Sequence, residues 1–381
     1  MRIAIILLNQ GRGSGEVARQ HARELLRHGH DVAFIHAANT GNVEGVRNVD
    51  VLIGDAPLPT HEYLPAGGTD QQAVSTMDAA TAESYLPAYA AALDSLGPLD
   101  LVYAHHANLT AIAAHDYATR TETPYVLFLH GTGIEPRHTG GYADEVWDRI
   151  EASILGAAGL LVTTHYVRDE LIRSLVPVPE DRFLVLPVGI DLVEFDPSHV
   201  GKIRDTYDLP EQYVISPGAL TMLKGPQNVV AATELYADLA PTIFTGDGPL
   251  RRDLEAALGE RGRFLGFVPA ADKAELINAA TVLTAAPEKR EHFGIIYVEA
   301  MGGGTVPVAY RGGGVDSIIT DGAGILTERD PQALGAAIAM TLGDPVGAAS
   351  MAAAGRRRAV EHYDKDRLGD VLNAWLEEIV T

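Results

Sequence analysis

Two glutamates eight positions apart, Glu291 and Glu299, lie in a segment that joins a turn, a short helix and a run of glycines. An apolar strand pattern precedes the loop of Glu291, and residues 295–301 predict an amphipathic helix. The loop and the start of this helix offer backbone N–H groups that suit phosphate oxygens. About one turn into the helix, the Glu299 carboxylate can accept hydrogen bonds from two neighbouring hydroxyls, whereas Glu291 lies nearer to whatever the phosphate carries. This combination predicts a nucleotide-sugar site.

A glutamate pair at this spacing more often represents two solvated charges on a loop and a helix. The neighbouring residues favour a site: a Phe-Gly turn at 293–294, Glu-Ala-Met at 299–301, glycines at 302–304 and then Pro307. The segment resembles the donor-site signature of the family 4 glycosyltransferases, which are retaining enzymes with the GT-B fold. Pro307 stands one residue later than is usual in that signature.

Three further fragments resemble the same family in the same order along the chain. Residues 187–191 are similar to its interdomain Pro-Asn-Gly-Val-Asp, with Val188 in place of the asparagine. Residues 246–249 are similar to its Gly-x-Gly-Pro turn, and residues 264–268 to its Phe-Leu-Gly-x-Val strand. The resemblance therefore covers nearly the whole chain.

Lys224 is the most informative cation in a chain that has few lysines. A diphosphate leaving group gains negative charge as the glycosidic bond breaks, so a fixed ammonium beside it stabilises the transition state. An ordinary surface lysine is the alternative, but its place before a glycine matches the family's Lys-Gly. The family has an arginine five residues earlier, where this chain has Ala219. We expect Lys289 or Arg290 to supply the missing charge.

Three glycines, Gly11, Gly13 and Gly15, alternate after the first strand and precede a helix. They allow a tight turn and a close approach of a ligand to the backbone. A dinucleotide-binding turn spreads its glycines differently and needs an acid about 20 residues on, whereas here the second strand ends near Asn39 without one. The resemblance implies a loop that closes over the sugar-phosphate end of the donor and helps to receive the acceptor.

His130 ends a predicted strand and precedes a glycine. Open parallel sheets bind ligands at the carboxyl ends of their strands, so this side chain is expected in the crevice between two domains. A core or capping histidine is the alternative. The resemblance implies contact between His130 and the transferred sugar.

The pairs His105-His106 and His115-Asp116 could suggest a metal site. Adjacent residues of a strand point to opposite faces, however, so the two neighbouring histidines are not expected to share an ion. We expect no metal and no cofactor besides the nucleotide diphosphate sugar, which is a co-substrate.

Four arginines follow the first strand, three of them at four-residue spacing on one helix face: Arg12, Arg19, Arg23 and Arg27. Related enzymes with lipid acceptors use such a patch against anionic membranes. Glu16 and Glu24 interrupt the stripe here, which favours a solvated, ion-paired face. An anionic acceptor or a weak peripheral membrane contact remains open.

Strands alternate with helices along the chain, which predicts α/β domains with parallel sheets. The first series has strands at 2–8, 32–37, 50–53, 99–104, 125–130, 159–164 and 182–186, with a helix at 16–28 and a long loop at 56–69. The second has strands at 213–216, 241–246, 263–267, 281–284 and 306–310, before a helical tail from 331.

The expected architecture is GT-B, with two Rossmann-like domains whose parallel sheets face a central cleft. We place an acceptor-binding domain at 1–190 and a donor-binding domain at 191–361, with a last helix at about 362–381 that the resemblance returns to the first domain.

The composition excludes some classes of function. With 29 basic and 51 acidic residues, the formal net charge is −22, which argues against general binding to nucleic acid. The chain has no cysteine for disulfides or thiolate metal sites. Its apolar opening is too short for a signal-peptide core, so a soluble, cytoplasmic protein is expected.

The resemblance implies a role for each site residue. Glu299 would bind the ribose hydroxyls and Glu291 the sugar hydroxyls, while Lys224 and the backbone of Phe293, Gly294 and Ile295 would bind the diphosphate. Val268 and Lys273 would lie near the base. The full set is: catalytic Lys224, Glu291 and His130; donor-binding Glu299, Phe293, Gly294, Ile295, Gly13, Gly15, Gly218, Val268, Lys273, Lys289 and Arg290.

The function expected is transfer of a hexosyl unit from a nucleotide diphosphate sugar to a hydroxyl of a sugar, lipid-linked or small-molecule acceptor. Two alternatives stay open. One is a nucleotide-sugar 2-epimerase on the same fold, and the other is a non-catalytic nucleotide-sugar binder, which the alanine at position 219 suggests.

Overall fold

The computed structural model describes residues 1–10, 13–37, 41–61 and 70–381. The chain divides into two compact units. Unit 1 comprises Met1–Pro187 and Asp366–Thr381, and unit 2 comprises Val188–Lys365. Within the described ranges, no helix is long and apolar enough to cross a membrane.

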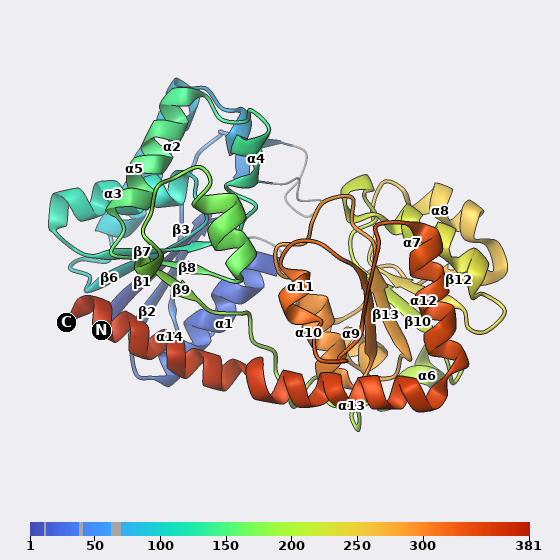
Figure 1. The fold of residues 1–381 in the computed structure, drawn as a ribbon. Helices are drawn as coiled ribbons and strands as arrows, with labels where there is room; N and C mark the ends of the chain where they lie inside the picture. The colour runs from blue at the N-terminus through green and yellow to red at the C-terminus, as the bar shows by residue number, and fades with distance from the viewer. Residues whose placement is uncertain (11–12, 38–40, 62–69) are drawn as a thin grey trace. The chain divides into compact units, whose positions relative to one another are not determined.

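Unit 1 is built on a seven-stranded sheet in which every neighbouring pair is parallel (Figure 1). Its order is β3 (Arg47–Asp50), β2 (Asp31–Ala37), β1 (Arg2–Asn9), β6 (Leu101–His105), β7 (Tyr125–Leu129), β8 (Gly159–Val162) and β9 (Phe183–Val185). The central strands β1, β6, β7 and β8 are buried along almost their whole length, which explains their nearly unbroken apolar sequences.

Helices cover both faces of this sheet. In Figure 1, one face carries α2 (Ala79–Asp94), α3 (Leu109–Thr121) and α5 (Asp144–Gly156), and the other carries α1 (Gly13–Arg27) and α14 (Lys365–Val380). A short α4 (Glu135–His138) precedes α5. The last helix is tied to this unit, because Arg27 pairs with Asp370 at 2.8 Å and His30 Nε2 lies 2.5 Å from Asn373 Oδ1.

Unit 2 has a six-stranded, wholly parallel sheet. Its order is β12 (Gly262–Phe264), β11 (Thr242–Thr245), β10 (Val214–Pro217), β13 (Val282–Ala285), β14 (Val306–Tyr310) and β15 (Ile325–Thr327). Its helices are α6 (Ile203–Thr206), α7 (Pro226–Ala232), α8 (Arg251–Leu258), α9 (Ala270–Asn278), α10 (Ile295–Gly303), α11 (Val315–Ile318), α12 (Pro331–Gly343) and α13 (Pro345–His362). Figure 1 shows α9 and α10 on one side of the sheet and α7 and α12 on the other.

Three local expectations from the sequence are wrong. The strand expected at 50–53 is β3 at Arg47–Asp50, a mostly exposed edge strand that pairs with β2. The segment expected as one loop contains β4 (Leu58–Thr60), which pairs with β5 (Gln71–Ala73), while residues 62–69 lie outside the described ranges. The helix α10 is not amphipathic, because it is buried from Tyr297 to Gly303 between other helices and the sheet.

Both sheets reverse their strand order at one point, between β1 and β6 in unit 1 and between β10 and β13 in unit 2. The crevice at the carboxyl ends of such strands is where open α/β sheets bind ligands. In unit 2 the loops at this point carry Lys224 and Glu291. In unit 1, the loop after β6 carries His106, and Gly13 and Gly15 lie in the first turn of α1, which follows β1. His130 follows β7, the next strand along.

Candidate functional site

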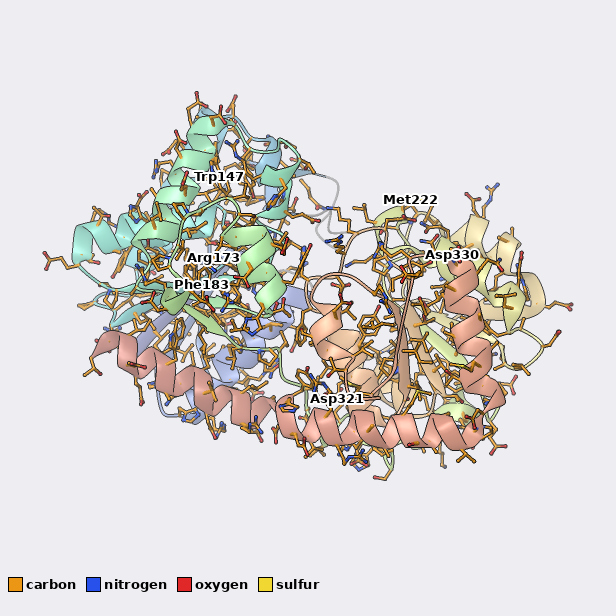
Figure 2. All side chains as sticks on the ribbon, in the orientation of Figure 1. Trp147, Arg173, Phe183, Met222, Asp321 and Asp330 are labelled. Atoms are coloured by element: carbon orange, nitrogen blue, oxygen red, sulfur yellow. The ribbon has the colours of Figure 1, made fainter. Side chains whose placement is uncertain are left out.

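The loop that carries Lys224 packs directly on the loop that follows β13. Gly225 has a left-handed backbone with φ of 66°, and a Cβ there would lie 1.8 Å from the carbonyl oxygen of Ala286. The backbone N–H of Glu288 donates to the carbonyl of Leu223 at 3.0 Å. Only glycine allows this approach, which explains the Lys-Gly sequence. Lys224 is exposed, and among the described residues no carboxylate pairs with its ammonium; Figure 2 labels its neighbour Met222 on the same turn.

The loop after β10 also meets the loop after β11. A Cβ on Gly246 would lie 2.1 Å from the carbonyl oxygen of Gly218, and a Cβ on Gly248 would lie 2.5 Å from that of Leu220. Gly218 itself is exposed, and no described atom lies within 4 Å of where its Cβ would be. The backbone of Gly218 therefore packs against Gly246 through its carbonyl group, while its Cα side is exposed. The next residue, Ala219, is half-buried.

A second glycine-rich loop, which is not among the site residues predicted from the sequence, holds the loop of Glu291. Glu291 forms an isolated parallel bridge with Gly313, and Gly314 donates its N–H to the Glu291 carbonyl at 2.7 Å. A Cβ on Gly314 would lie 1.8 Å from the carbonyl oxygen of His292. The signal in the sequence was the run of glycines at 312–314 directly after the strand 306–310.

The start of α10 lies under the Glu291 side chain. Gly294 has φ of 88° and precedes the helix without any side-chain cap in the described structure. A Cβ on Gly294 would lie 3.1 Å from Cγ of Glu291 and 2.6 Å from the ring of Tyr297. The first N–H groups of α10, from Ile295 onward, are thus uncapped by side chains, which is the property of an anion site.

Glu299 and Lys273 form a bidentate ion pair. The Lys273 ammonium lies 2.8 and 2.7 Å from the two carboxylate oxygens of Glu299. The Glu299 side chain is 9% exposed and the Lys273 side chain 32% exposed, so the pair is partly desolvated. The sequence placed these residues separately near the ribose and the base, and the structure brings them together from α9 and α10.

A further carboxylate, Glu194, lies close to this pair. Burial raises the pKa of Glu194, and the charges of Asp191 and Glu299 raise it further, against the opposing effect of Lys273. Asp191 is itself bonded to Lys365 at 2.6 Å. The sequence gave no sign of this cluster, because its members are distant along the chain.

Val268 and the cations beside Glu291 complete the unit 2 set. Val268 is half-buried between β12 and α9, the helix that carries Lys273. Lys289 and Arg290 are both exposed. The Arg290 side chain runs along the second glycine loop, where a Cβ on Gly312 would lie 3.6 Å from its Nε.

In unit 1, His130 lies in a group of aromatic rings rather than alone. Its Nε2 is 2.9 Å from Nδ1 of His105, and its ring stacks on Phe128 with centroids 3.9 Å apart. The expectation that His105 and His106 point apart is wrong, because His106 leaves the strand with a left-handed φ of 70°. Both rings approach His130, with centroids 5.1 and 4.5 Å away. Among the described residues, no three His, Cys, Asp or Glu side chains are arranged to hold a metal.

The first helix begins close to the end of β1. A Cβ on Gly15 would lie 2.1 Å from the carbonyl oxygen of Gln10, so only glycine fits there. Gly13 is exposed, and no described atom lies within 4 Å of where its Cβ would be. Gly11 and Arg12 lie outside the described residues.

The basic face of α1 is ion-paired. Arg19 and Arg23 both bind Glu16, at 2.9 and 3.0 Å. Arg27 binds Glu24 at 2.8 Å and Asp370 at 2.8 Å. These three arginines are therefore neutralised locally, in agreement with the ion-paired face favoured by the sequence.

Two family models match this chain in sequence. The model described as glycosyl transferase 4-like domain matches residues 12–189, and the model described as glycosyl transferases group 1 matches residues 202–358. The α-maltose-1-phosphate synthase of Mycolicibacterium smegmatis is 26% identical over 290 residues, 68% of this chain and 74% of that protein. The D-inositol 3-phosphate glycosyltransferase of Xylanimonas cellulosilytica is 28% identical over 377 residues, 91% of this chain and 86% of that protein.

Solved structures show the same fold at lower sequence identity. Sucrose-phosphate synthase from Thermosynechococcus elongatus has a TM-score of 0.81 and 20% identity, covering 99% of this chain and 98% of that one. The Anabaena protein HepE, in complex with UDP and glucose, has a TM-score of 0.78 and 17% identity, and the match covers 99% of this chain and 100% of that one. Since the two family models together match most of its length, the chain belongs to the family 4 glycosyltransferases and has their GT-B fold.

Proposed function

We propose that this glycosyltransferase moves a hexosyl unit, with retention of anomeric configuration and without a metal ion, from a nucleotide diphosphate sugar in unit 2 to a hydroxyl acceptor in unit 1. One arrangement carries the proposal. At the strand-order reversal of unit 2, the exposed Lys224 stands on a loop that packs on the loop of Glu291 and the uncapped start of α10. This combination of a cation, free N–H groups and carboxylates suits a diphosphate joined to two polyols.

The diphosphate would take its hydrogen bonds from the backbone at Phe293, Gly294 and Ile295 and its counter-charge from Lys224. The C1–O bond to phosphate breaks as the acceptor oxygen attacks the same face of the sugar, and the acceptor's proton passes to an oxygen of the leaving phosphate. Lys224 stabilises the charge that develops on that phosphate. No carboxylate of unit 1 is needed as a nucleophile.

Recognition of the two polyols would be divided between the glutamates. Glu299, whose two oxygens lie 2.8 and 2.7 Å from the Lys273 ammonium, would accept from the ribose hydroxyls. Glu291, whose Cγ lies over the start of α10, would accept from the transferred sugar. His130, which follows β7, is proposed to contact the transferred sugar. Gly13 and Gly15, at the start of α1, are proposed to help bind the donor.

The acceptor is proposed as a hydroxyl of a sugar, a sugar phosphate or a lipid-linked polyol. HepE was solved with UDP and glucose, and the named relatives include a maltose-1-phosphate synthase and an inositol-phosphate glycosyltransferase. None of the relatives named here is an epimerase. A binder without catalysis would hold the donor but neither transfer nor hydrolyse the sugar, which distinguishes it in a single assay.

The division of roles predicts different losses in two variants. Glu299→Ala should weaken both the free nucleoside diphosphate and the sugar donor, by about 1.5–3 kcal/mol for a charged hydrogen bond, because its partner is the ribose. Glu291→Ala should weaken only the sugar donor. Calorimetric titration of both ligands measures this, with the exposed Glu260→Ala in the same unit as the control. Equal losses for both ligands in both variants would refute the assignment.

Transfer is predicted to survive metal removal, because Lys224 and the helix start neutralise the diphosphate. The chain's one Asp-x-Asp sequence, 364–366, lies at the start of α14, where Asp364 bridges to Ile190. Initial rates should be equal before and after EDTA treatment. Complete loss with EDTA, restored by magnesium or manganese, would show that an ion takes part.

The alanine at 219 is predicted to be compensated by Lys289 or Arg290. Ala219→Arg should then leave diphosphate affinity unchanged or weaken it, because the added cation meets charges already present. Lys289→Ala or Arg290→Ala should cost about 1–3 kcal/mol of binding. Calorimetry measures all three, with the exposed Lys202→Ala as the control. Tighter binding in Ala219→Arg, with neither alanine variant impaired, would contradict compensation.

A further inference from the structure

His130 belongs to a connected group of histidines that the proposed reaction does not otherwise use. The group spans α1, the loop after β4 and the ends of β6 and β7, and its members are His21, His61, His105, His106 and His130. In this group, Nδ1 of His105 lies within hydrogen-bond distance of Nε2 of His130, at 2.9 Å.

The His105 ring is held rigidly. It is fully buried at 0% exposure and lies against Tyr103 and Phe128, with centroid distances of 4.8 and 5.3 Å. Its backbone carbonyl accepts from the Thr110 hydroxyl at 2.6 Å. A side chain fixed in this way holds its Nδ1 in one position, 2.9 Å from Nε2 of His130.

The two ring nitrogens of His105 have different surroundings. Nδ1 faces His130, whereas Nε2 is buried and has no hydrogen-bond partner among the described residues. Burial keeps the pKa of His105 well below its ordinary value, so the ring is neutral and carries one proton. A proton on Nε2 would leave a buried N–H unpaired, which proteins avoid more strictly than an unpaired acceptor. The proton therefore belongs on Nδ1, where it is donated to His130.

We propose that His105 is a positioning residue that fixes the tautomer of His130. Because His130 Nε2 accepts the proton of His105, neutral His130 carries its own proton on Nδ1. The ring thus presents an N–H donor at Nδ1, suited to an oxygen of the transferred sugar. The contact with the sugar rests on the proposed function, whereas the tautomer of His130 is inferred only from contacts within unit 1.

The direct test is NMR of the full chain with ¹⁵N-labelled histidine, in which His130→Gln identifies the signals of His130. The wild-type ring should show a protonated Nδ1 and an unprotonated Nε2 at neutral pH. His105→Leu removes the donor and should shift His130 toward the Nε2–H form that free histidine prefers. His105→Asn places an amide near the former Nδ1 and should restore the wild-type pattern. A wild-type His130 protonated on Nε2, or one unchanged in His105→Leu, overturns the proposal.

Kinetic measurements on the same variants test whether the tautomer of His130 matters for sugar transfer. His105→Leu should lower kcat about fivefold or more, the worth of one hydrogen bond, with affinity for free nucleoside diphosphate unchanged and with recovery in His105→Asn. His115→Leu is the control, since His115 bonds to Tyr125 in the same unit. An equal loss in His105→Asn would overturn the positioning role. If the NMR result holds while His130→Ala transfers sugar at the wild-type rate, the tautomer stands and the sugar contact fails.

Discussion

The candidate site depends on the contact between two backbone segments in unit 2, Gly225 against Ala286. A Cβ at Gly225 would lie 1.8 Å from the Ala286 carbonyl oxygen, so this contact exists only because the residue is glycine with φ of 66°. It sets Lys224 beside the loop after β13, and the glycines after β14 then hold Glu291 on the other side through the 2.7 Å bond from Gly314. Contacts between backbone segments thus fix the positions of the two loops from which the charged side chains of Lys224 and Glu291 extend.

The charges of the side chains determine what this arrangement can bind. The chain has a formal net charge of −22 and few lysines. In unit 2, Lys273 forms an ion pair with Glu299, whereas Lys224 is exposed. The Lys273 ammonium lies 2.8 and 2.7 Å from the two oxygens of the Glu299 carboxylate, which is 9% exposed and has further lone pairs that can accept from hydroxyls. In unit 1, burial lowers the pKa of His21 to about 4 and keeps the pKa of His105 well below its ordinary value, so these two rings are neutral and act as hydrogen-bonding groups rather than as charges.

Much of the fold could be predicted because the central strands are buried on both sides. Residues 125–129 and 306–310 read as continuous apolar runs and are fully buried strands. The edge strand β3 was misplaced, since its residues Arg47–Asp50 are mostly exposed and the apolar run follows it. The sequence also could not show that Lys273 meets Glu299, 26 positions away, or that His106 adopts φ of 70° and so breaks the strand alternation. Backbone conformation at a non-glycine residue and long-range pairing are set by the tertiary structure.

The central claim is that the exposed Lys224 at the strand-order reversal of unit 2 binds the diphosphate of the donor. Calorimetric titration of nucleoside diphosphates into the full chain and into Lys224→Met, both in EDTA, tests it most directly. We expect at least one nucleoside diphosphate to bind the unmodified chain and its Kd to rise about tenfold to a hundredfold in the variant, as for the loss of a charged hydrogen bond of roughly 1.5–3 kcal/mol. Equal Kd values for the two proteins would contradict the account.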